Sequence, residues 1–273
     1  MESLHGRVAV ITGAAGGIGE ALGTVLSASG MKLVLADIDV EGLIAARDRL
    51  AGAGAEVIAV PTDVTSEKSV TRLKDSALEH FGSVHVLCNN AGVTVTGAAW
   101  TIPVSAWERV LSVNLIGAIN GIRAFVPVLR NNDEGHVVNT ASMAGLTSAA
   151  GLAPYSVSKH GVVALSEAVY KELLLEDSRI GVSVVCPGAV ATAMPASVTG
   201  AALGDQGPVD RAIASAVDES LKTAISPMRV AESIKVAILQ EKFWVLTHPS
   251  RANSIVRRAR GIVAGINPDP GVF

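Results

Sequence analysis

Charged side chains are scarce in this 273-residue chain. They make up 17% of the residues, compared with about 25% in an average soluble domain, and the formal net charge is −3. The scarcity is concentrated in three windows of 28, 24 and 25 residues, which lie between Glu79 and Glu108, Glu134 and Lys159, and Arg179 and Asp205. Each window is longer than the roughly 20 apolar residues that span a bilayer, so membrane helices have to be considered first.

The three charge-free windows do not have the composition of membrane spans. They contain helix breakers and side-chain amides, among them Asn89, Asn90, Asn139, Pro154 and Pro187. A lipid-exposed helix must satisfy all of its backbone groups internally, which these residues oppose. The Gly-rich stretch 8–19 follows only a single arginine and makes a poor secretory signal. The sequence therefore predicts a cytoplasmic protein with no membrane span and no targeting segment.

Cysteine and aromatic residues are also few. Cys88 and Cys186 are the two cysteines, and aromatic residues make up 3% of the chain. Both cysteines lie in apolar, strand-like runs, which predicts buried free thiols rather than a disulfide and fits a reducing compartment. The pI of about 6.1 gives no reason to expect a nucleic-acid partner. No metal site is predicted.

Short apolar runs alternate along the chain with longer helix-like segments. The predicted strands are 7–12, 32–37, 56–61, 84–89, 136–140, 181–186 and 243–247. The predicted helices are 17–29, 40–50, 66–81, 104–129, 154–175 and 230–241. Most of the strands are continuously apolar, as expected of strands that are covered on both faces. This βα rhythm predicts an α/β fold, a doubly wound parallel sheet of seven strands with helices on both faces and a ligand at the carboxyl ends of the strands. We expect one domain over residues 1–273.

One long segment interrupts this rhythm. About forty residues separate the sixth strand from the next helix, far more than a usual connection. Ile213, Val217, Leu221 and Ile225 recur every four residues and predict an amphipathic helix after Pro208. The segment 189–229 is either an irregular packed insertion or a lid over the site; we favour the lid.

A glycine cluster follows the first predicted strand and leads into the first helix. In the run 12–19, Gly13 permits a tight turn, Gly17 lets the backbone approach a phosphate, and Gly19 allows close packing of helix on strand. The pyrophosphate of a dinucleotide would then meet the positive end of the helix. A glycine cluster alone is a weak signal, but its position between a strand and a helix strengthens it.

Asp37 ends the second predicted strand, 18 residues after Gly19. An acidic side chain at this place binds the adenosine ribose hydroxyls of NAD and repels the 2′-phosphate of NADP. Neither Ala14, Ala15 nor Ile38 offers a cation for that phosphate. The alternative is that Asp37 merely begins a turn with Asp39. We favour NAD over NADP.

An ordered set of motifs resembles the short-chain dehydrogenase/reductase family in its compact, single-domain, Rossmann-like form. The motifs are 12–19, Asp63-Val64, Asn89-Asn90-Ala91-Gly92, Asn114, Ser142, Tyr155 to Lys159, and Pro187-Gly188 with Thr192, and the resemblance covers about residues 7–247. It implies the cofactor-binding residues Gly13, Gly16, Gly17, Ile18, Gly19, Asp37, Asp63, Val64, Asn90, Ala91, Gly92, Tyr155, Lys159, Pro187, Gly188, Val190 and Thr192. In particular, it implies that Asp63 and Val64 contact the adenine and that Thr192 contacts the nicotinamide carboxamide.

The candidate catalytic residues are Asn114, Ser142, Tyr155 and Lys159. Tyr155 and Lys159 are four residues apart on a predicted helix and so share one face. A free phenol ionises near pH 10, so a base working near pH 7 needs a shift of roughly three units, about 4 kcal/mol. The Lys159 ammonium and a positive nicotinamide ring can both contribute to this shift. Ser142 would bind the reacting oxygen, and Asn114 resembles the residue that holds a water between Lys159 and solvent.

Each of these residues also has a structural alternative. Ser142 could be a helix cap, Tyr155 half-buried packing, Lys159 a solvated charge and Asn114 a helix-bending amide. Together they match the order and spacing of one catalytic constellation. We therefore expect hydride transfer, in which Tyr155 takes the hydroxyl proton while hydride passes from carbon to NAD.

The expected walls of the substrate site are 93–98, 143–152 and 189–203. They offer Thr94, Thr96, Met143, Leu146, Leu152, Val190 and Met194 and no charged side chain. This favours a lipophilic secondary alcohol or ketone, such as a steroid, terpene or aromatic compound, over a phosphorylated or carboxylate substrate. The alternatives are a 3-ketoacyl thioester reductase, which would resemble NADPH users, and a non-catalytic NAD-sensing protein on the same fold.

Two further features concern partners. The predicted helices 104–129 and 154–175 are more apolar than one sheet-facing side requires, and family members pair there as dimers or tetramers, so we expect a homodimer or homotetramer. The tail 249–273 is basic, with Arg251, Arg257, Arg258 and Arg260. It could dock on membranes or acids; we favour a solvated helix face or a subunit contact. Trp244 and His248 are weaker candidates for closing the pocket.

Overall fold

The computed structural model describes residues 1–132, 134–192, 215, 219 and 222–268. Its centre is a seven-stranded sheet in the order β3-β2-β1-β4-β5-β6-β7, with every neighbouring pair parallel. The strands are β1 Val8–Thr12, β2 Lys32–Asp37, β3 Val57–Pro61, β4 Val86–Asn89, β5 Gly135–Thr140, β6 Ile180–Cys186 and β7 Trp244–Leu246. The predicted doubly wound parallel sheet is confirmed. The strand order reverses between β1 and β4, which is where such sheets bind ligands.

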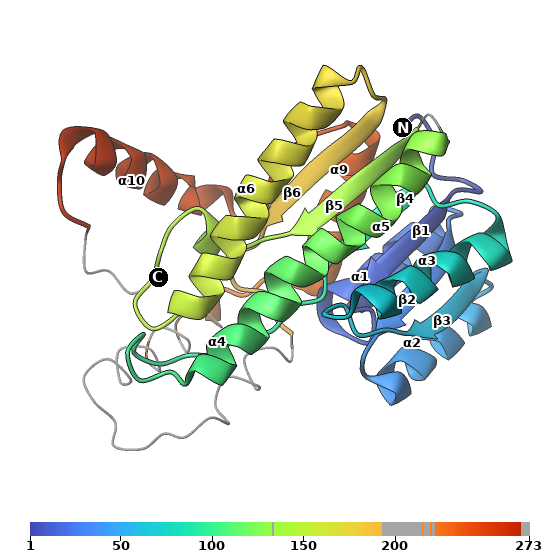
Figure 1. Cartoon of the computed structure of the whole chain (residues 1–273), viewed down its shortest axis with the longest axis horizontal. Coiled ribbons are helices and arrows are strands. Elements are labelled where there is room, and N and C mark those ends of the chain that lie inside the picture. Colours follow the sequence, from blue (N-terminus) through green and yellow to red (C-terminus); the bar gives the residue numbers. More distant parts are fainter. Residues whose placement is uncertain (133, 193–214, 216–218, 220–221, 269–273) are drawn as a thin grey trace.

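Helices cover both faces of the sheet (Figure 1). One hydrophobic cluster joins the sheet to α1 Gly17–Ala28, α2 Val40–Gly52 and α9 Pro227–Leu239. A second joins the other face to α3 Glu67–Phe81, α5 Gly117–Asn131 and α6 Ala153–Leu175. The strands are continuously apolar because both faces are covered, and all five residues of β1 are buried.

The helix predicted over 104–129 is interrupted. It consists of α4 Val104–Leu111, a π-helical turn Ser112–Ile116 and α5. Asn114 lies in the π turn and is buried. Single π turns inside helices are often found at functional sites. The sequence pattern did not reveal the turn, because the apolar residues on either side keep helical spacing.

The span Val104–Asn131 is the one stretch of the described residues long and apolar enough to cross a membrane. Its α5 part, however, contacts β4, β5 and α3, and Phe125 and Leu129 are fully buried there. It is therefore accounted for as a core helix of the domain. The two cysteines, Cys88 and Cys186, are free and buried as predicted.

The chain after β7 forms α10 Ala252–Ala264, which extends from the body of the domain (red in Figure 1). The amphipathic helix predicted after Pro208 and most of the predicted lid lie outside the described residues. At the edges of that segment, Val190 and Ile225 form an isolated parallel bridge.

Candidate functional site

A cavity of about 1920 Å³ opens at the carboxyl ends of the strands. It is larger than the ~300–1,000 Å³ of a typical small-molecule pocket, which leaves room for a cofactor and a second molecule. The predicted site residues that line it are Gly13, Gly16, Gly17, Ile18, Asp37, Asp63, Val64, Asn90, Ala91, Gly92, Ser142, Tyr155, Lys159, Pro187, Gly188, Val190 and Thr192. Gly19 and Asn114 lie behind the wall. The fold thus brings together residues that are up to 179 positions apart, Gly13 and Thr192, in one cavity.

The glycine-rich turn forms the floor of the cavity beside β1. A side chain at Gly13 would place its Cβ 2.8 Å from the Cα of Ala91, and one at Gly19 would come within 1.9 Å of the Gly13 carbonyl oxygen. These close approaches exclude any other residue. Gly16 is the N-cap residue of α1, and Gly16, Gly17 and Ile18 all line the cavity. The N-terminus of α1 therefore presents backbone N–H groups and a positive dipole end to an anion such as a pyrophosphate.

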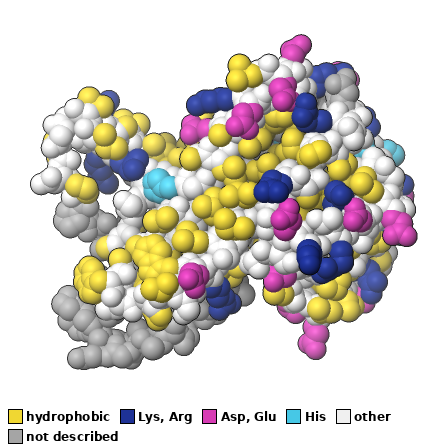
Figure 2. All heavy atoms as spheres, in the orientation of Figure 1, with side chains coloured by type: hydrophobic (Ala, Val, Ile, Leu, Met, Phe, Trp, Pro, Cys, Tyr) yellow, Lys and Arg dark blue, Asp and Glu magenta, His cyan; other side chains and the backbone are white. Residues whose placement is uncertain are grey.

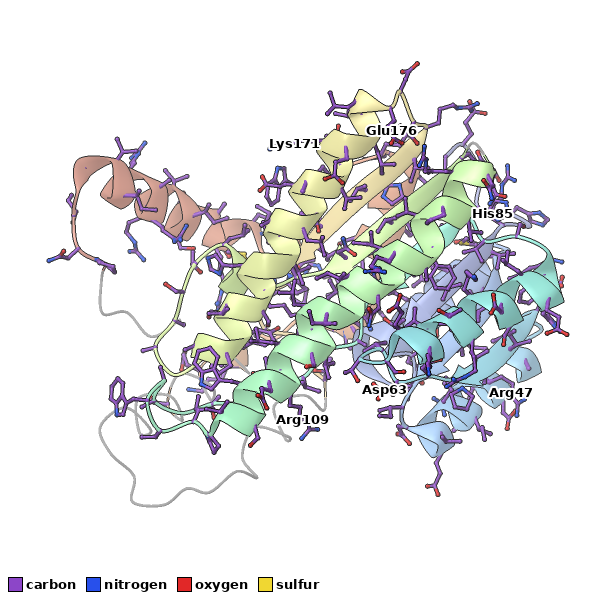
Figure 3. All side chains as sticks on the ribbon, viewed as in Figure 1. Arg47, Asp63, His85, Arg109, Lys171 and Glu176 are labelled. Atoms are coloured by element: carbon purple, nitrogen blue, oxygen red, sulfur yellow. The ribbon has the colours of Figure 1, made fainter. Side chains whose placement is uncertain are left out.

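The only acidic side chains in the described cavity lining, Asp37 and Asp63, stand on the side of β2 and β3 (Figure 3 labels Asp63). Asp37 Oδ2 accepts a hydrogen bond of 2.9 Å from the Ala15 N–H, and its Oδ1 accepts one of 3.0 Å from the Asp39 N–H. The turn with Asp39 that we considered as an alternative therefore exists. It does not remove the carboxylate from the cavity, because Asp37 also lines the cavity wall.

Asn90 joins the ends of β1 and β4. Its Nδ2 donates to the carbonyl oxygens of Thr12 and Gly13 at 3.1 and 3.3 Å, and its Oδ1 accepts from the Thr140 hydroxyl at 3.3 Å. The Thr12 hydroxyl in turn accepts from the N–H groups of Asn90 and Ala91 at 3.0 and 3.1 Å. These bonds fix the glycine-rich turn against the loop after β4.

Tyr155 and Lys159 lie one turn apart on α6 and both face the cavity. The Lys159 Nζ is 5.6 Å from the centre of the Tyr155 ring and donates a 2.7 Å hydrogen bond to the Thr140 carbonyl oxygen. Burial lowers the pKa of Lys159 to about 8 from its usual value of 10.5, and the nearby Cys186 opposes this. Lys159 is therefore buried rather than a solvated charge, which rules out the alternative we considered for it.

Tyr155 is half-buried, with its ring at the cavity wall. Desolvation by its surroundings raises the pKa of its phenol, and a hydrogen bond with the Ser142 side chain acts in the opposite direction. The protein groups alone therefore favour the protonated phenol, the form that donates a proton.

Ser142 follows β5 and lies between α6 and the loop after β6. Its Oγ accepts from the Ala144 N–H at 3.1 Å, so it caps the short helix Met143–Gly145, and donates to the Pro187 carbonyl oxygen at 3.4 Å. The cap that we considered as an alternative is thus present, but the side chain also contacts Tyr155. Pro187 O further accepts from the Met143 N–H at 2.8 Å, so the two loops are joined.

The side chain of Asn114 makes three hydrogen bonds. Its Oδ1 accepts from the Val93 N–H at 2.8 Å, and its Nδ2 donates to Val93 O and to Ser158 Oγ, both at 2.9 Å. Asn114 thus fixes the loop after β4 to α6, the helix that carries Lys159. A small second cavity of about 10 Å³, with Asn114 and Thr140 in its wall, is close to the minimum size for one water.

The substrate side of the cavity differs in two respects from the prediction. Thr94, Thr96, Met143, Leu152 and Val190 line it as expected. Leu146 does not, and Met194 lies outside the described residues. The described parts of the three predicted wall segments carry no charged side chain, as expected, but the cavity extends beyond them and is also lined by Arg109 of α4 and by the arginines of the tail. Sequence reasoning missed them because they are remote from the motifs; the four arginines of the tail were the available signal.

His248 and Trp244 do not close the pocket. Neither side chain lines the cavity, and Trp244 is 46% exposed. His248 lies behind Gly188, where a Cβ on that glycine would approach the imidazole to 2.9 Å. Among the described residues, no cluster of three or more His, Cys, Asp or Glu could hold a metal ion.

The fold and the site together define an oxidoreductase of the dinucleotide-binding class. The doubly wound parallel sheet has a glycine-rich first turn and an acidic residue at the end of its second strand, and a Ser-Tyr-Lys group lies at the same edge. The chain belongs to the short-chain dehydrogenase/reductase family. Residues 7–202 match the family described as short chain dehydrogenase.

Individual relatives agree with this assignment. The chain is 34% identical over 248 residues to a 1-deoxy-11-beta-hydroxypentalenate dehydrogenase of Streptomyces avermitilis, covering 90% of this chain and 86% of that one. It is 30% identical to a CLA biosynthesis dehydrogenase/reductase of Lactiplantibacillus plantarum, covering 98% and 97%. The crystal structure of a Burkholderia phymatum short-chain dehydrogenase/reductase in complex with NAD superposes with a TM-score of 0.93 at 38% identity, covering 100% of both chains. The protein is therefore an oxidoreductase of this family.

Proposed function

We propose that the protein interconverts a lipophilic secondary alcohol and its ketone with NAD. The observation that carries this proposal is the convergence of Ser142, Tyr155 and Lys159 on one wall of a cavity whose floor is the glycine-rich turn. The small second cavity contains neither these three residues nor the glycines of that turn in its described lining. In the direction of oxidation, the substrate C–H bond breaks with its electron pair leaving as hydride, and the O–H proton moves to the Tyr155 oxygen.

NAD fits this cavity because Gly13, Gly16 and Gly17 leave space beside the N-terminus of α1 and the Asp37 carboxylate faces the same space. When bound, NAD⁺ accepts the hydride and adds positive charge near Tyr155, which favours the phenolate against the effect of burial. Lys159 keeps two N–H groups beyond its bond to Thr140 for the nicotinamide ribose. Asn114 would hold a water that links Lys159 to solvent, and the proton would leave by this path.

Asp37 supports NAD rather than NADP. Its carboxylate would lie against the 2′-position of the adenosine ribose, where it can accept from hydroxyls but repels a phosphate. The described lining near it, Gly16, Ile38 and Thr62 among others, offers no lysine or arginine to neutralise that phosphate. The structure of the Burkholderia relative in complex with NAD supports NAD binding.

A mostly apolar reaction chamber supports a lipophilic substrate. Met143, Leu152, Val190 and the methyl groups of Thr94 and Thr96 surround the position in front of Ser142 and Tyr155. Thr94 Oγ1 is a buried hydroxyl without a hydrogen-bond partner among the described residues. By their names, the Streptomyces relative is a dehydrogenase of a hydroxypentalenate and the Lactiplantibacillus relative is a dehydrogenase/reductase of CLA biosynthesis.

The test is turnover of a panel of secondary alcohols with NAD or NADP by the wild type and by Tyr155→Phe. We expect NAD-dependent oxidation, and a loss of about 10²–10⁴-fold in kcat in Tyr155→Phe because the general base is removed. Tyr170→Phe is the matched control, because the other tyrosine packs against Phe243 away from the cavity. NADPH-dependent reduction of a ketoacyl thioester would replace the proposal with the rival reductase. NAD binding without turnover of any alcohol would indicate an NAD sensor.

We also propose a cytoplasmic homodimer or homotetramer. The outward faces of α5 and α6 carry apolar side chains, which Figure 2 shows in yellow across this face of the molecule. Val157 is 51% exposed and Ile116 of the π turn 42% exposed. The two free thiols support a reducing compartment.

A further inference from the structure

The charges that line the main cavity are strongly asymmetric. Its acidic lining residues, Asp37 and Asp63, are confined to the expected adenosine side. On the substrate side the described lining includes Arg109 and four further arginines, Arg251, Arg257, Arg258 and Arg260, and no acid. The catalytic Lys159 adds another cation to the same space. A cavity lined by one sign of charge concentrates ligands of the opposite sign.

The four arginines of the tail lie on α10 and at its N-cap, outside the one stripe of the helix that does not line the cavity. The residues of this helix that do not line the cavity, Ala252, Ile255, Ala259 and Val263, recur at spacings of three and four and form a single stripe. Ile255 in this stripe packs against the cluster that contains Met143 and Leu246. The remaining face of α10 borders the cavity and carries every arginine of the helix and of its N-cap. In Figure 2, dark blue side chains lie on the side of α10 that borders the hollow.

These arginines are not used by the fold. Within the described residues, none of Arg251, Arg257, Arg258 and Arg260 belongs to an ion pair, whereas Arg7, Arg47, Arg49, Arg123 and Arg130 do. No residue of α10 is buried, so the helix gains little from packing. Four unpaired guanidinium groups on one short segment repel each other, and an anion between them would relieve this repulsion.

We propose that the arginine face of α10, formed by Arg251, Arg257, Arg258 and Arg260, binds an anionic group at the far end of an otherwise lipophilic substrate. This inference rests on the proposed function for the reacting end of that substrate. Its carbinol or carbonyl oxygen meets Ser142 and Tyr155, its apolar body fills the space between Met143 and Leu152, and its carboxylate or phosphate reaches α10. Guanidinium groups bind both kinds of oxyanion in bidentate geometry.

The test uses decanoic acid with a hydroxyl on the penultimate carbon, supplied as the free carboxylate, the methyl ester and the coenzyme A thioester. The variant is Arg257→Gln, Arg258→Gln and Arg260→Gln combined. The control is Lys68→Gln, Arg72→Gln and Lys242→Gln combined, which removes the same charge from exposed positions outside the cavity. We expect the variant to raise the KM for the carboxylate at least tenfold, to leave the KM for the ester and kcat for both unchanged, and to abolish the rise of KM between about 50 and 500 mM salt. The control should behave like the wild type.

The thioester separates the two sources of negative charge. A KM lower for the thioester than for the carboxylate, and raised in the arginine variant, assigns the site to phosphates; the reverse order assigns it to a carboxylate. Equal KM values for carboxylate and ester in the wild type, or no change in the variant, would overturn the proposal. So would loss of co-sedimentation with anionic phosphatidylglycerol vesicles in the variant without any change in KM, because α10 would then be a membrane contact.

A failure of the proposed function can be told apart from a failure of this inference. Calorimetric titration of the NAD-loaded protein with decanoate and with methyl decanoate measures anion binding without turnover. Binding of decanoate that is at least tenfold tighter in the wild type than in the arginine variant supports the site even if no alcohol is oxidised. Turnover of neutral alcohols together with equal binding of acid and ester would leave the proposed function standing and refute the arginine site.

Discussion

The Nδ1 atom of His248 accepts a hydrogen bond of 3.0 Å from the backbone N–H of Gly188. A backbone N–H can only donate, so this nitrogen carries no proton and His248 is the neutral Nε2–H form. Burial, followed by the charge of Arg251, lowers the pKa of His248; Arg229 acts in the same direction and the Ala189 backbone against it. His248 thus supports the Pro187-Gly188 loop from behind, while Ser142 and Met143 contact Pro187 from the other side.

Loss of this hydrogen bond should weaken cofactor binding. His248→Ala leaves the Gly188 N–H without its partner, at a cost of about 1 kcal/mol, and we expect a KM for NAD about fivefold higher. His248→Asn places an amide oxygen near the position of Nδ1 and should restore most of the affinity. The measurement is steady-state kinetics with varied NAD, with His80→Asn on the exposed end of α3 as control.

The same pair predicts a pH dependence. Protonation of His248 would place an Nδ1–H donor opposite the Gly188 N–H donor and break their hydrogen bond. The wild type should therefore lose NAD affinity as pH falls below about 6.5. In His248→Asn the affinity should be flat over this range. Parallel pH profiles for the two proteins would show that His248 does not act on the loop.

Lys159 makes stability depend on pH at the alkaline side. Its pKa is about 8 in the folded chain and near 10.5 in the unfolded chain, so between these values the unfolded chain binds more protons. Folding stability contributed by this site therefore rises with pH from 8 to 10.5, by up to about 3 kcal/mol. Denaturant unfolding measures the free energy of unfolding of the wild type and of Lys159→Met across this range. The wild-type value should rise relative to the variant value as pH increases. A difference that does not vary with pH would contradict the prediction.

His136 should act at the acid side. It is fully buried, its Nε2 is 2.8 Å from Ser183 Oγ, and the Ser183 hydroxyl donates to Lys242 O at 2.6 Å. Nε2 is therefore the donor and Nδ1 is unprotonated. Burial lowers the pKa of His136 to about 4. Stability present above pH 6.5 should be lost as pH falls toward 4, by up to about 3 kcal/mol, because only the unfolded chain binds the proton.

The comparison for His136 is His136→Gln, whose amide can still donate to Ser183 but does not titrate. The variant is expected to be less stable at neutral pH and to lose less stability than the wild type between pH 6.5 and 4. Chemical denaturation at several pH values measures both slopes. Equal slopes would mean that His136 is not responsible for the acid sensitivity.

Asp37 should decide cofactor preference. Asp37→Asn keeps an oxygen for the Ala15 N–H but removes the charge, so NADP should gain at least tenfold relative to NAD in kcat/KM. Asp39→Asn is the matched control two residues away, because Asp39 caps α2 through the Gly42 N–H and does not line the cavity. An unchanged NAD to NADP ratio in Asp37→Asn would mean that another group selects the cofactor.

The features that lie on one element or at its ends could be predicted from the sequence. The continuous apolar runs gave the seven strands, because a doubly covered strand needs apolar residues at every position. Tyr155 and Lys159 were placed on one helix face by their spacing, and the glycine-rich turn and Asp37 by their positions at strand ends. The composition of the charge-free windows likewise argues against membrane spans. All three contribute to the cavity wall: the first supplies Asn90, the second Ser142 and Tyr155, and the third Pro187 and Gly188.

What the tertiary structure alone decided depends on contacts between distant segments. No local sequence pattern indicates the π turn at Asn114 or the position of the α10 arginines. The same holds for the hydrogen bond of Gly188 with a histidine 60 residues later in the chain. From the sequence, the basic tail could dock on membranes or acids, and a solvated helix face or a subunit contact was the favoured interpretation. Its place beside the cavity follows from the packing of Ile255 against the cluster around Met143. Periodicity records which way a side chain points on its own helix, whereas the group it faces is fixed only when the whole sheet has brought the segments together.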